Sequence, residues 1–304
     1  MRFEDSFFGA AVVCFFFAMY SDLCSKSIGC GLAVFSLNSE ITHSICRQLS
    51  NEHTDITIIE TSDGSHSLFV PALNETYHSR HGAMQESQWV FIKNGLASAF
   101  DSARASKEPR IHEAGFGNTE VKLQEDQGPE RSRVRIHEVG FGTGLNALLA
   151  MRWAEEHQVN VHFTTLETNV LSPELAAQLN YASSEPERSD FLKMHTCAWN
   201  EDVAVTSYFT LQKAQRRVQD EQAESEYDVV FYDAFGPPTQ PEMWTLSIFQ
   251  RMYSALKPGG IFVTYCAKGQ VRRDLQAAGF TVERLPGPPG KREMLRATKP
   301  LLHG

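Results

Sequence analysis

The chain has 304 residues, of which 42% are apolar and 21% are charged, as in an ordinary globular protein. This length accommodates one large α/β domain with additions or two small domains. A formal net charge of −9 gives the protein no overall attraction for nucleic acid. The six cysteines include no C-x-x-C pair and indicate neither a zinc site nor a disulfide framework, so we expect no metal and predict reduced thiols in a cytoplasmic protein.

We interpret residues 1–50 as an N-terminal extension, disordered or not native, that the remaining chain does not need. The apolar run 7–20 is too short to span a membrane comfortably, so no membrane contact is expected. A secretory signal would begin with basic residues, whereas Arg2 is outweighed by Glu4 and Asp5. A poor signal and a surface-associated helix are alternatives to the interpretation that we favour, which is sequence translated upstream of the natural start.

Residues 51–100 predict a small hairpin followed by a helix. Two β-prone runs, 57–59 and 68–70, flank Asp63-Gly64, a pair that is typical of hairpin turns. An amphipathic helix is predicted over 85–100. Its apolar side carries Trp89, Val90, Ile92 and Leu96.

Residues 101–133 are polar and charged and predict an insert loop, longer than a compact domain usually contains. Within it, 110–117 (RIHEAGFG) repeats the sequence of 135–142 (RIHEVGFG). The first copy has no third glycine and no apolar helix behind it. We therefore interpret it as a degenerate duplication and not as a second site.

An apolar, strand-like run ends in Glu138 and three glycines spaced two apart, Gly140, Gly142 and Gly144. Glycine in a strand-to-helix turn permits positive φ and close approach of a ligand, and the helix start directs free N–H groups toward that ligand. A dinucleotide-binding fingerprint needs glycine at the position of Leu145, so a dinucleotide site is not predicted. A nucleoside-triphosphate loop is not predicted either, because no lysine follows at the required spacing. The spacing resembles motif I of class I S-adenosylmethionine (SAM) methyltransferases. A glycine turn without a ligand is the alternative.

Downstream, helices and strands alternate, which predicts an α/β fold with a mostly parallel, Rossmann-like sheet and helices on both faces. We predict a class I SAM-dependent methyltransferase domain with a seven-stranded sheet over 134–304. The predicted helices after the glycine turn are 145–157, 172–180, 211–222, 240–255 and 269–278. The predicted strands after it are 160–166, 203–209, 228–233, 260–266, 280–285 and 292–297. Ligands of such sheets lie beyond the carboxyl ends of the strands.

Two carboxylates follow such strand ends. Glu167 comes 23 residues after Gly144, a spacing that favours a carboxylate bonding both ribose hydroxyls of a nucleoside, with a solvated acid as the alternative. Asp233 precedes an Ala-Phe-Gly-Pro-Pro run, which resembles the acceptor-side motif of SAM methyltransferases. Because an ammonium has no lone pair to donate, amine methylation needs a nearby proton acceptor, and Asp233 is the candidate. A helix cap is its competing interpretation.

The C-terminal region is locally basic. Residues 257–299 contain nine Lys or Arg against three acids. This excess on an acidic protein is compatible with a polyanion that docks on one face, and Lys268, Arg272, Lys291 and Arg292 are candidates for phosphate contacts. A solvated basic edge explains the same charges and is left open.

Several motifs are more specific than those of methyltransferases in general. They are Glu138 to Asn146, Tyr232 to Pro237, Pro241 to Trp244, Val271 to Arg273, Gly279-Phe280 and Gly290 to Met294, with Tyr77, Ser79, Gly82 and Glu86 near the start. Together they resemble the methyltransferase half of the bifunctional MnmC family, and more closely its stand-alone, MnmD-type relatives. The resemblance runs from about Ile58 to Ala297 and leaves 1–50 and 101–133 unmatched.

The resemblance implies SAM-dependent N-methylation of 5-aminomethyl(-2-thio)uridine at the tRNA wobble position, with tRNA as partner and no obligate protein partner. The chain ends soon after Met294, so we expect neither the family's FAD-dependent oxidase half nor FAD. The expected cofactor contacts are Glu138, Gly140, Phe141, Gly142, Gly144, Asn146, Glu167 and Asp233. The expected substrate contacts are Tyr77, Ser79, Phe235, Lys268, Arg272, Lys291 and Arg292, and Asp233 is the expected catalytic residue.

Other functions stay open on the residues alone. A SAM methyltransferase of another amine would use the same turn. An aminopropyltransferase that uses a decarboxylated relative of SAM would also use this turn. Its acceptor is a polycation that needs several carboxylates, and the basic region 257–299 argues against such a site. A non-catalytic nucleoside-binding or RNA-binding module could also use this fold, but Glu167 and Asp233 at two strand ends favour a working enzyme.

Overall fold

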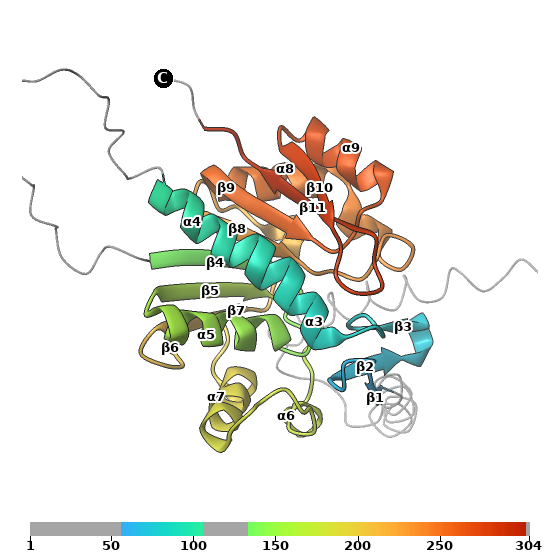
Figure 1. Cartoon of the computed structure of the whole chain (residues 1–304), viewed down its shortest axis with the longest axis vertical. Helices are drawn as coiled ribbons and strands as arrows, with labels where there is room; N and C mark the ends of the chain where they lie inside the picture. The colour runs from blue at the N-terminus through green and yellow to red at the C-terminus, as the bar shows by residue number, and fades with distance from the viewer. Residues whose placement is uncertain (1–55, 106–132, 302–304) are drawn as a thin grey trace, which may run out of the picture. The chain divides into compact units, whose positions relative to one another are not determined.

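Eight strands form one sheet in the part of the chain that the structure, a computed structural model, describes, residues 56–105 and 133–301 (Figure 1). Their order is β10-β11-β9-β8-β4-β5-β7-β6. The expected extension 1–50 and the repeat at 110–117 lie outside the described residues. The strands are β4 (Arg133–Val139), β5 (Asn160–Leu166), β6 (Asp202–Ala204), β7 (Phe209–Ala214), β8 (Tyr227–Tyr232), β9 (Leu256–Thr264), β10 (Thr281–Pro286) and β11 (Glu293–Thr298).

The centre of the sheet is parallel and its two edges are antiparallel. Strands β7, β5, β4, β8 and β9 run parallel to one another, whereas β11 pairs antiparallel with β9 and β10, and β6 with β7. The mostly parallel α/β sheet is confirmed, with eight strands instead of seven. The predicted strand 203–209 overlaps β6 and only the first residue of β7, so β7 is the additional strand.

Side chains alternate across the sheet, as the two-residue period of a strand requires. On β8, Val229 and Phe231 join one core, whereas Val230 and Tyr232 join the other. Helix α5 (Leu145–His157) covers the first core, and α8 (Leu246–Ala255) and α9 (Gly269–Ala277) cover the second (Figure 1). Apolar residues on both faces of β8 are typical of a parallel strand covered on both sides.

The N-terminal segment, residues 56–105, contains the predicted hairpin and helix. Gly64 at the hairpin turn has a φ of 81°, and the two strands on either side pair antiparallel. The predicted helix begins two residues earlier, extends to Ala105 and is π-helical in its middle. The elements are β1 (Thr57–Glu60), β2 (His66–Val70), η1 (Pro71–Leu73), β3 (Glu75–Thr76), α3 (Ala83–Ser87), η2 (Gln88–Ala97) and α4 (Ser98–Ala105).

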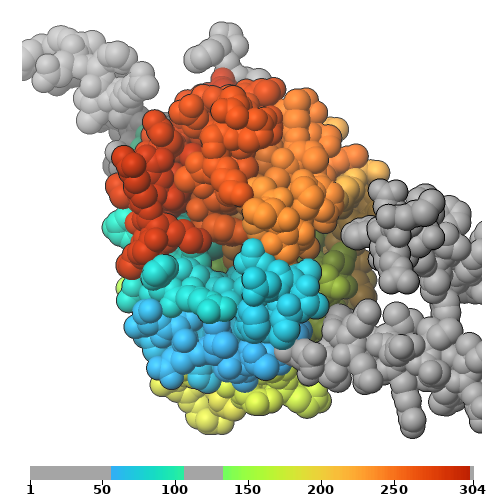
Figure 2. Space-filling view, turned by 90° about the vertical axis from the view of Figure 1, so that its right-hand side faces the viewer, coloured from blue at the N-terminus to red at the C-terminus, as the bar shows by residue number. Residues whose placement is uncertain are grey.

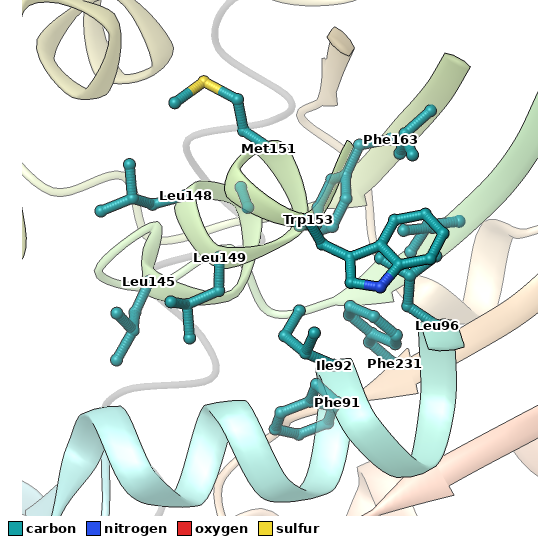
Figure 3. Packing of buried hydrophobic residues seen from close by; sticks show 14 of the residues in the cluster. Phe91, Ile92, Leu96, Leu145, Leu148, Leu149, Met151, Trp153, Phe163 and Phe231 are labelled. Atoms are coloured by element: carbon teal, nitrogen blue, oxygen red, sulfur yellow. The ribbon is translucent and has the colours of Figure 1, made fainter. Parts of the chain in front are cut away.

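The long helical stretch of this segment packs on the sheet beside α5. Figure 3 shows Phe91, Ile92 and Leu96 of η2 near Phe231 of β8, with the apolar side chains of α5 on the other side. The predicted Trp89 is only half-buried and donates its indole N–H to the main-chain oxygen of Pro286 at 2.8 Å. The segment therefore reaches both the sheet and the C-terminal hairpin.

The predicted helix 211–222 is wrong. Residues 209–214 pair with β5 as strand β7, and burial there alternates, with Leu211 and Lys213 fully buried. Good helix formers thus occupy a strand because cross-strand pairing and burial override their intrinsic preference. Only a short turn of 3-10 helix, η4 (Val218–Asp220), follows.

The region before β6 also differs from the prediction. The predicted helix 172–180 is shortened to α6 (Pro173–Ala176), and a longer helix, α7 (Glu185–Thr196), was not predicted. Its start signal was available, because Ser184 accepts a hydrogen bond from the Glu187 N–H as an N-cap. The other predicted elements agree with the structure within a few residues, with η5 (Pro241–Trp244) preceding α8. No helix of the described residues is both long and apolar enough to cross a membrane.

Candidate active site

The turn between β4 and α5 contains three glycines with positive φ, 95° at Gly140, 50° at Gly142 and 75° at Gly144. A Cβ on Gly140 would lie 2.9 Å from the main-chain oxygen of Asp233, and a Cβ on Gly142 would lie 3.0 Å from the Tyr77 ring. Glycine is needed at these two positions both for the backbone conformation and for the close contact. The turn thus touches the end of β8 on one side and the N-terminal segment on the other.

Three carboxylates converge beside this turn, from the ends of β4, β5 and β8. Glu138 is fully buried, and one carboxyl oxygen accepts a hydrogen bond from the Thr165 hydroxyl at 2.7 Å. Its Oε1 has no hydrogen-bond partner among the described residues. Burial raises the pKa of Glu138 well above its ordinary value, and the charges of Asp233 and Glu167 add to this. A cationic ligand would favour the charged form of these carboxylates.

Glu167, directly after β5, is tied to the turn by main-chain donors. Its Oε2 accepts a hydrogen bond from the Gly142 N–H at 3.0 Å. Its Oε1 accepts from the N–H groups of Thr168 and Asn169, each at 2.7 Å. These bonds fix the half-buried carboxylate in place and leave it further lone pairs for the hydroxyls of a ligand.

Asp233, directly after β8, lies beside this turn and is followed by Ala234, which the Tyr265 hydroxyl contacts. The Asn146 side-chain amide donates to Asp233 Oδ2 at 2.8 Å, and Asn146 Oδ1 has no partner among the described residues. Burial raises the pKa of Asp233 to about 7, with Glu86 adding to the effect and Asn146 and Lys291 opposing it. A carboxylate with such a pKa is suited to accept and release a proton near neutral pH.

A buried ion pair and an aromatic ring are connected to the chain segment that follows Asp233. Glu86 of α3 is 5% exposed and accepts a hydrogen bond from the Lys291 ammonium. Lys291 Nζ lies 4.0 Å from the centre of the Tyr265 ring, within the range of a cation–π contact. The Tyr265 hydroxyl in turn donates to the main-chain oxygen of Ala234 at 2.9 Å. A continuous set of contacts therefore connects Glu86 to the chain beside Asp233.

Two further aromatic rings meet beside the turn. Tyr77 and Phe235 lie edge to face with their ring centres 5.2 Å apart. Desolvation, with the charge of Glu167, raises the pKa of Tyr77 to about 12, so its hydroxyl remains a hydrogen-bond donor. The Ser79 N–H donates to Glu86 at 2.8 Å. In Figure 2 the blue and cyan N-terminal segment lies against the orange and red C-terminal part, the two regions that supply this side of the site.

Two buried histidines contact the glycine turn at Thr143. His78 Nε2 lies 2.6 Å from the Thr143 hydroxyl, and His195 Nε2 lies 3.1 Å from the Thr143 main-chain oxygen. Burial lowers the pKa of each histidine to about 4, so both are neutral at pH 7. They connect the N-terminal segment and α7 to the turn without adding charge.

Most of the predicted site residues lie together, around the turn and Asp233. Phe141 differs from the other predicted cofactor residues, because its ring is buried between Gly144 and the His195 ring, with the two ring centres 5.1 Å apart. Lys268 and Arg292 are exposed and Arg272 is half-buried, and within the described residues no ion pair or side-chain hydrogen bond joins them to the groups around Asp233. The predicted residues that lie around the turn and Asp233 are Tyr77, Ser79, Glu138, Gly140, Gly142, Gly144, Asn146, Glu167, Phe235 and Lys291.

Several positive charges of the basic region 257–299 already have partners within the protein. Four of its nine cations are held in ion pairs, Lys257, Arg284, Lys291 and Arg296. Lys299 donates to main-chain carbonyls of Tyr253 and Leu256. Within the described part of the chain, the other four cations of this region, Lys268, Arg272, Arg273 and Arg292, form no ion pair and donate to no main-chain carbonyl through their side chains.

Two residues of the site, Glu86 and Tyr265, are missing from the predicted site residues. Tyr265 follows β9 as Asp233 follows β8, so the rule that selected strand ends also applies to it. Glu86 stands in the motif near the start, but its ion pair with Lys291 joins positions 205 residues apart. No local pattern could reveal that pairing.

Comparisons with known proteins identify the family and the fold of the chain. A family model described as S-adenosyl-L-methionine-dependent methyltransferase matches residues 190–300. The tRNA 5-methylaminomethyl-2-thiouridine biosynthesis bifunctional protein MnmC of Pseudomonas fluorescens (strain Pf0-1) is 31% identical over 236 residues, which cover 73% of this chain and 32% of that protein. Its Chromobacterium violaceum counterpart is 33% identical over 231 residues, which cover 72% of this chain and 31% of that protein.

The chain carries an MnmC-type methyltransferase domain. It spans about a third of the length of the curated MnmC proteins that it matches. The crystal structure of MNMC2 from Aquifex aeolicus superposes with a TM-score of 0.61 and 22% sequence identity, covering 96% of this chain and 84% of that chain. At this identity the likeness concerns the fold alone. With the family model, it confirms the predicted SAM-dependent methyltransferase fold.

Proposed function

We propose that this MnmC-type domain transfers a methyl group from SAM to the amine of 5-aminomethyl(-2-thio)uridine at the wobble position of tRNA. The observation that carries the proposal is the position of Asp233, which bonds to Asn146 beside the glycine turn and is followed by Ala234, the acceptor of the Tyr265 hydroxyl. Burial raises the pKa of this carboxyl group to about 7. The substrate class comes from the MnmC relatives, which are named for tRNA 5-methylaminomethyl-2-thiouridine biosynthesis. A tRNA substrate implies a cytoplasmic protein.

The residues of the glycine turn fit SAM as the methyl donor. When bound, SAM supplies an electrophilic methyl group on a positively charged sulfur. Glu138 Oε1 and Asn146 Oδ1 are buried acceptors without a partner among the described residues, as a ligand with an ammonium group requires. Glu167, held by main-chain donors, is suited to accept hydrogen bonds from both ribose hydroxyls.

Asp233 performs the proton transfer in this proposal. A primary amine is largely an ammonium at neutral pH and has no lone pair until a base removes a proton. Asp233 accepts that proton, and the hydrogen bond from Asn146 holds the carboxyl group in one orientation. The half-buried rings of Tyr77 and Phe235 provide an aromatic surface on which a uracil ring can stack.

The tRNA backbone would contact the basic rim. Lys268, Arg272 and Arg292 form no ion pair with a described residue, so their charges are available to phosphates. Such contacts orient the tRNA without reading its bases. Selection of the wobble uridine then depends on the residues around Asp233.

Methyl transfer from labelled SAM onto tRNA isolated from a strain lacking this enzyme tests the proposal. Nucleoside mass spectrometry should find the label on the wobble uridine as the 5-methylaminomethyl form. Unlabelled wobble uridine would overturn the proposed substrate, and label on another nucleoside would identify a different acceptor. The Asp233→Asn variant should bind SAM, measured by isothermal titration calorimetry, and transfer little of its label.

A further inference from the structure

Asp233 receives opposing charges from two partners that belong to one ion pair. Glu86 and Lys291 bond to each other, and Lys291 lies over the ring of Tyr265, whose hydroxyl reaches the main chain beside Asp233. Glu86 also accepts the Ser79 N–H at 2.8 Å, so its carboxylate is held from two directions. The pair is therefore fixed next to the proposed base by contacts from three distant segments of the chain.

We propose that the Glu86–Lys291 pair is a positioning element that sets the pH at which Asp233 takes up a proton, with Glu86 strengthening proton uptake and Lys291 weakening it. This inference rests on the proposed function, because it assigns the pair to the same proton transfer. Neither residue needs to touch the acceptor amine, since each acts through the field at Asp233. Asp233 is half-buried and Glu86 is buried, so water screens the charges between them less than it would on an open surface.

Other titratable and polar groups also surround Asp233. Burial is the largest cause of the raised pKa of Asp233, and Glu86 is the largest contribution from another charge. Buried Glu138 is a further carboxylate that interacts with Asp233, and the Tyr265 phenol keeps its proton because burial raises its pKa well above the ordinary value. His78, close to the pair, is neutral at the pH of interest because its pKa is lowered to about 4. Asn146 donates a hydrogen bond and does not titrate.

The Glu86→Gln variant should move the titration of Asp233 to lower pH. It removes the negative charge and keeps an oxygen that can accept the Ser79 N–H, so we expect a downward shift of about one pH unit. The shift is read in the acid limb of the rate of methyl transfer in a single turnover. It is read separately, without substrate, in the carboxyl signal of protein carrying carbon-13-labelled aspartate, with Asp233 assigned by the loss of its signal in Asp233→Asn.

Adding Lys291→Met to Glu86→Gln should move the titration back to higher pH, because the opposing positive charge is then gone. The double variant leaves no unpaired buried carboxylate at position 86. Glu86→Asp keeps the charge and should titrate close to the wild type. The control Asp220→Asn removes a carboxylate from the exposed Arg217–Asp220 pair and should leave both readouts unchanged.

An unmoved Asp233 signal in Glu86→Gln, or a double variant that titrates like the single one, would overturn the positioning role. If Glu86→Gln does not fold, judged by its SAM binding and circular dichroism, the single variant Lys291→Met decides. Its Asp233 signal should titrate at higher pH than that of the wild type, and an unmoved signal contradicts the inference. Because the carboxyl signal needs no tRNA, a failure of the proposed substrate would leave this measurement independent.

Discussion

The two sides of the site are assembled in different ways. The side proposed to hold SAM, here called the cofactor side, consists of Glu138, Gly142 and Glu167. These residues come from a single strand–turn–helix–strand unit, β4 to β5, and form hydrogen bonds with one another or with neighbours in that unit. The side proposed to receive the amine, here called the acceptor side, includes the ion pair of Glu86 and Lys291, which are 205 residues apart in the sequence. The first side can form wherever this one unit folds. The second side exists only when the N-terminal helix lies on the sheet next to the C-terminal hairpin.

This difference predicts that substitutions on the two sides have different effects on SAM affinity and on methyl transfer. A change on the acceptor side should impair methyl transfer or tRNA binding and leave SAM affinity intact. A change in the turn should weaken SAM binding directly. Asp233 is the residue at which the two sides meet, since Asn146 bonds to it from one side and Glu86 acts on it from the other.

The largest effect is expected for Asp233→Asn. The amide cannot accept a proton from the amine, so the rate of methyl transfer should fall by roughly 10²- to 10⁴-fold, the usual contribution of a positioned base. SAM affinity, measured by titration calorimetry, should change little, because the variant keeps the size of the side chain. An equal loss of SAM affinity and of rate would show that Asp233 serves the cofactor side alone.

Gly140→Ala should act on the other side of the comparison. The methyl group would lie 2.9 Å from the Asp233 main-chain oxygen at a φ of 95°, so the turn must move or bear strain of about 1–3 kcal/mol. We expect SAM to bind roughly tenfold or more weakly. Gly259→Ala is the matched control, because its φ is 80° and its Cβ would meet only the Leu301 side chain, at 3.1 Å. An equal loss of SAM affinity in the control would remove the special role of the turn.

The cofactor side is also the part that could be predicted from the sequence. A glycine turn, a buried strand before it and a carboxylate after the next strand are local patterns with a fixed spacing, and the structure has Glu138, Gly142 and Glu167 within one β–α–β unit. Helix α5 and strand β5 match their predicted spans for the same reason. Regular periods of apolar residues determine these elements locally.

The acceptor side could be predicted only in part, because it depends on contacts between distant segments. Lys291 was selected for its charge as a phosphate contact, whereas in the structure its charge is used against Glu86 and the Tyr265 ring. The same limit explains strand β7, where buried Lys213 donates to the main-chain oxygen of His195 and a helix-forming sequence takes strand pairing instead. Contacts with distant residues determine the role of Lys291 and the strand conformation of β7, and the local sequence pattern does not reveal such contacts.

The contact of His78 with Thr143 joins the two sides, and its pH dependence should be measurable. The ordinary pKa of 6.5 applies to the unfolded chain, and burial lowers the pKa to about 4 in the folded protein. The unfolded chain therefore binds more protons between these values, so the free energy of unfolding should fall as the pH drops from about 6.5 to 4, by up to about 3 kcal/mol from this residue.

Urea unfolding at a series of pH values measures this loss. His137 and His195, whose pKa values burial also lowers to about 4, should add to it. His78→Gln should therefore keep part of the pH dependence and show a shallower decline than the wild type. An identical decline in the variant would mean that His78 is not the buried neutral link between the N-terminal segment and the turn.

The smallest effect is expected at the basic rim. Arg292 is exposed and forms no ion pair with a described residue, so Arg292→Gln should weaken tRNA binding by a few-fold and lower the slope of log affinity against log salt by about 0.7–0.9 if it removes one phosphate contact. Arg217→Gln removes an exposed arginine from its pair with Asp220 and is the matched control. Both variants should bind SAM as the wild type does, because neither residue contacts the turn. Equal salt slopes for the two variants would mean that the local basic excess is a solvated edge and that tRNA reaches Asp233 by another face.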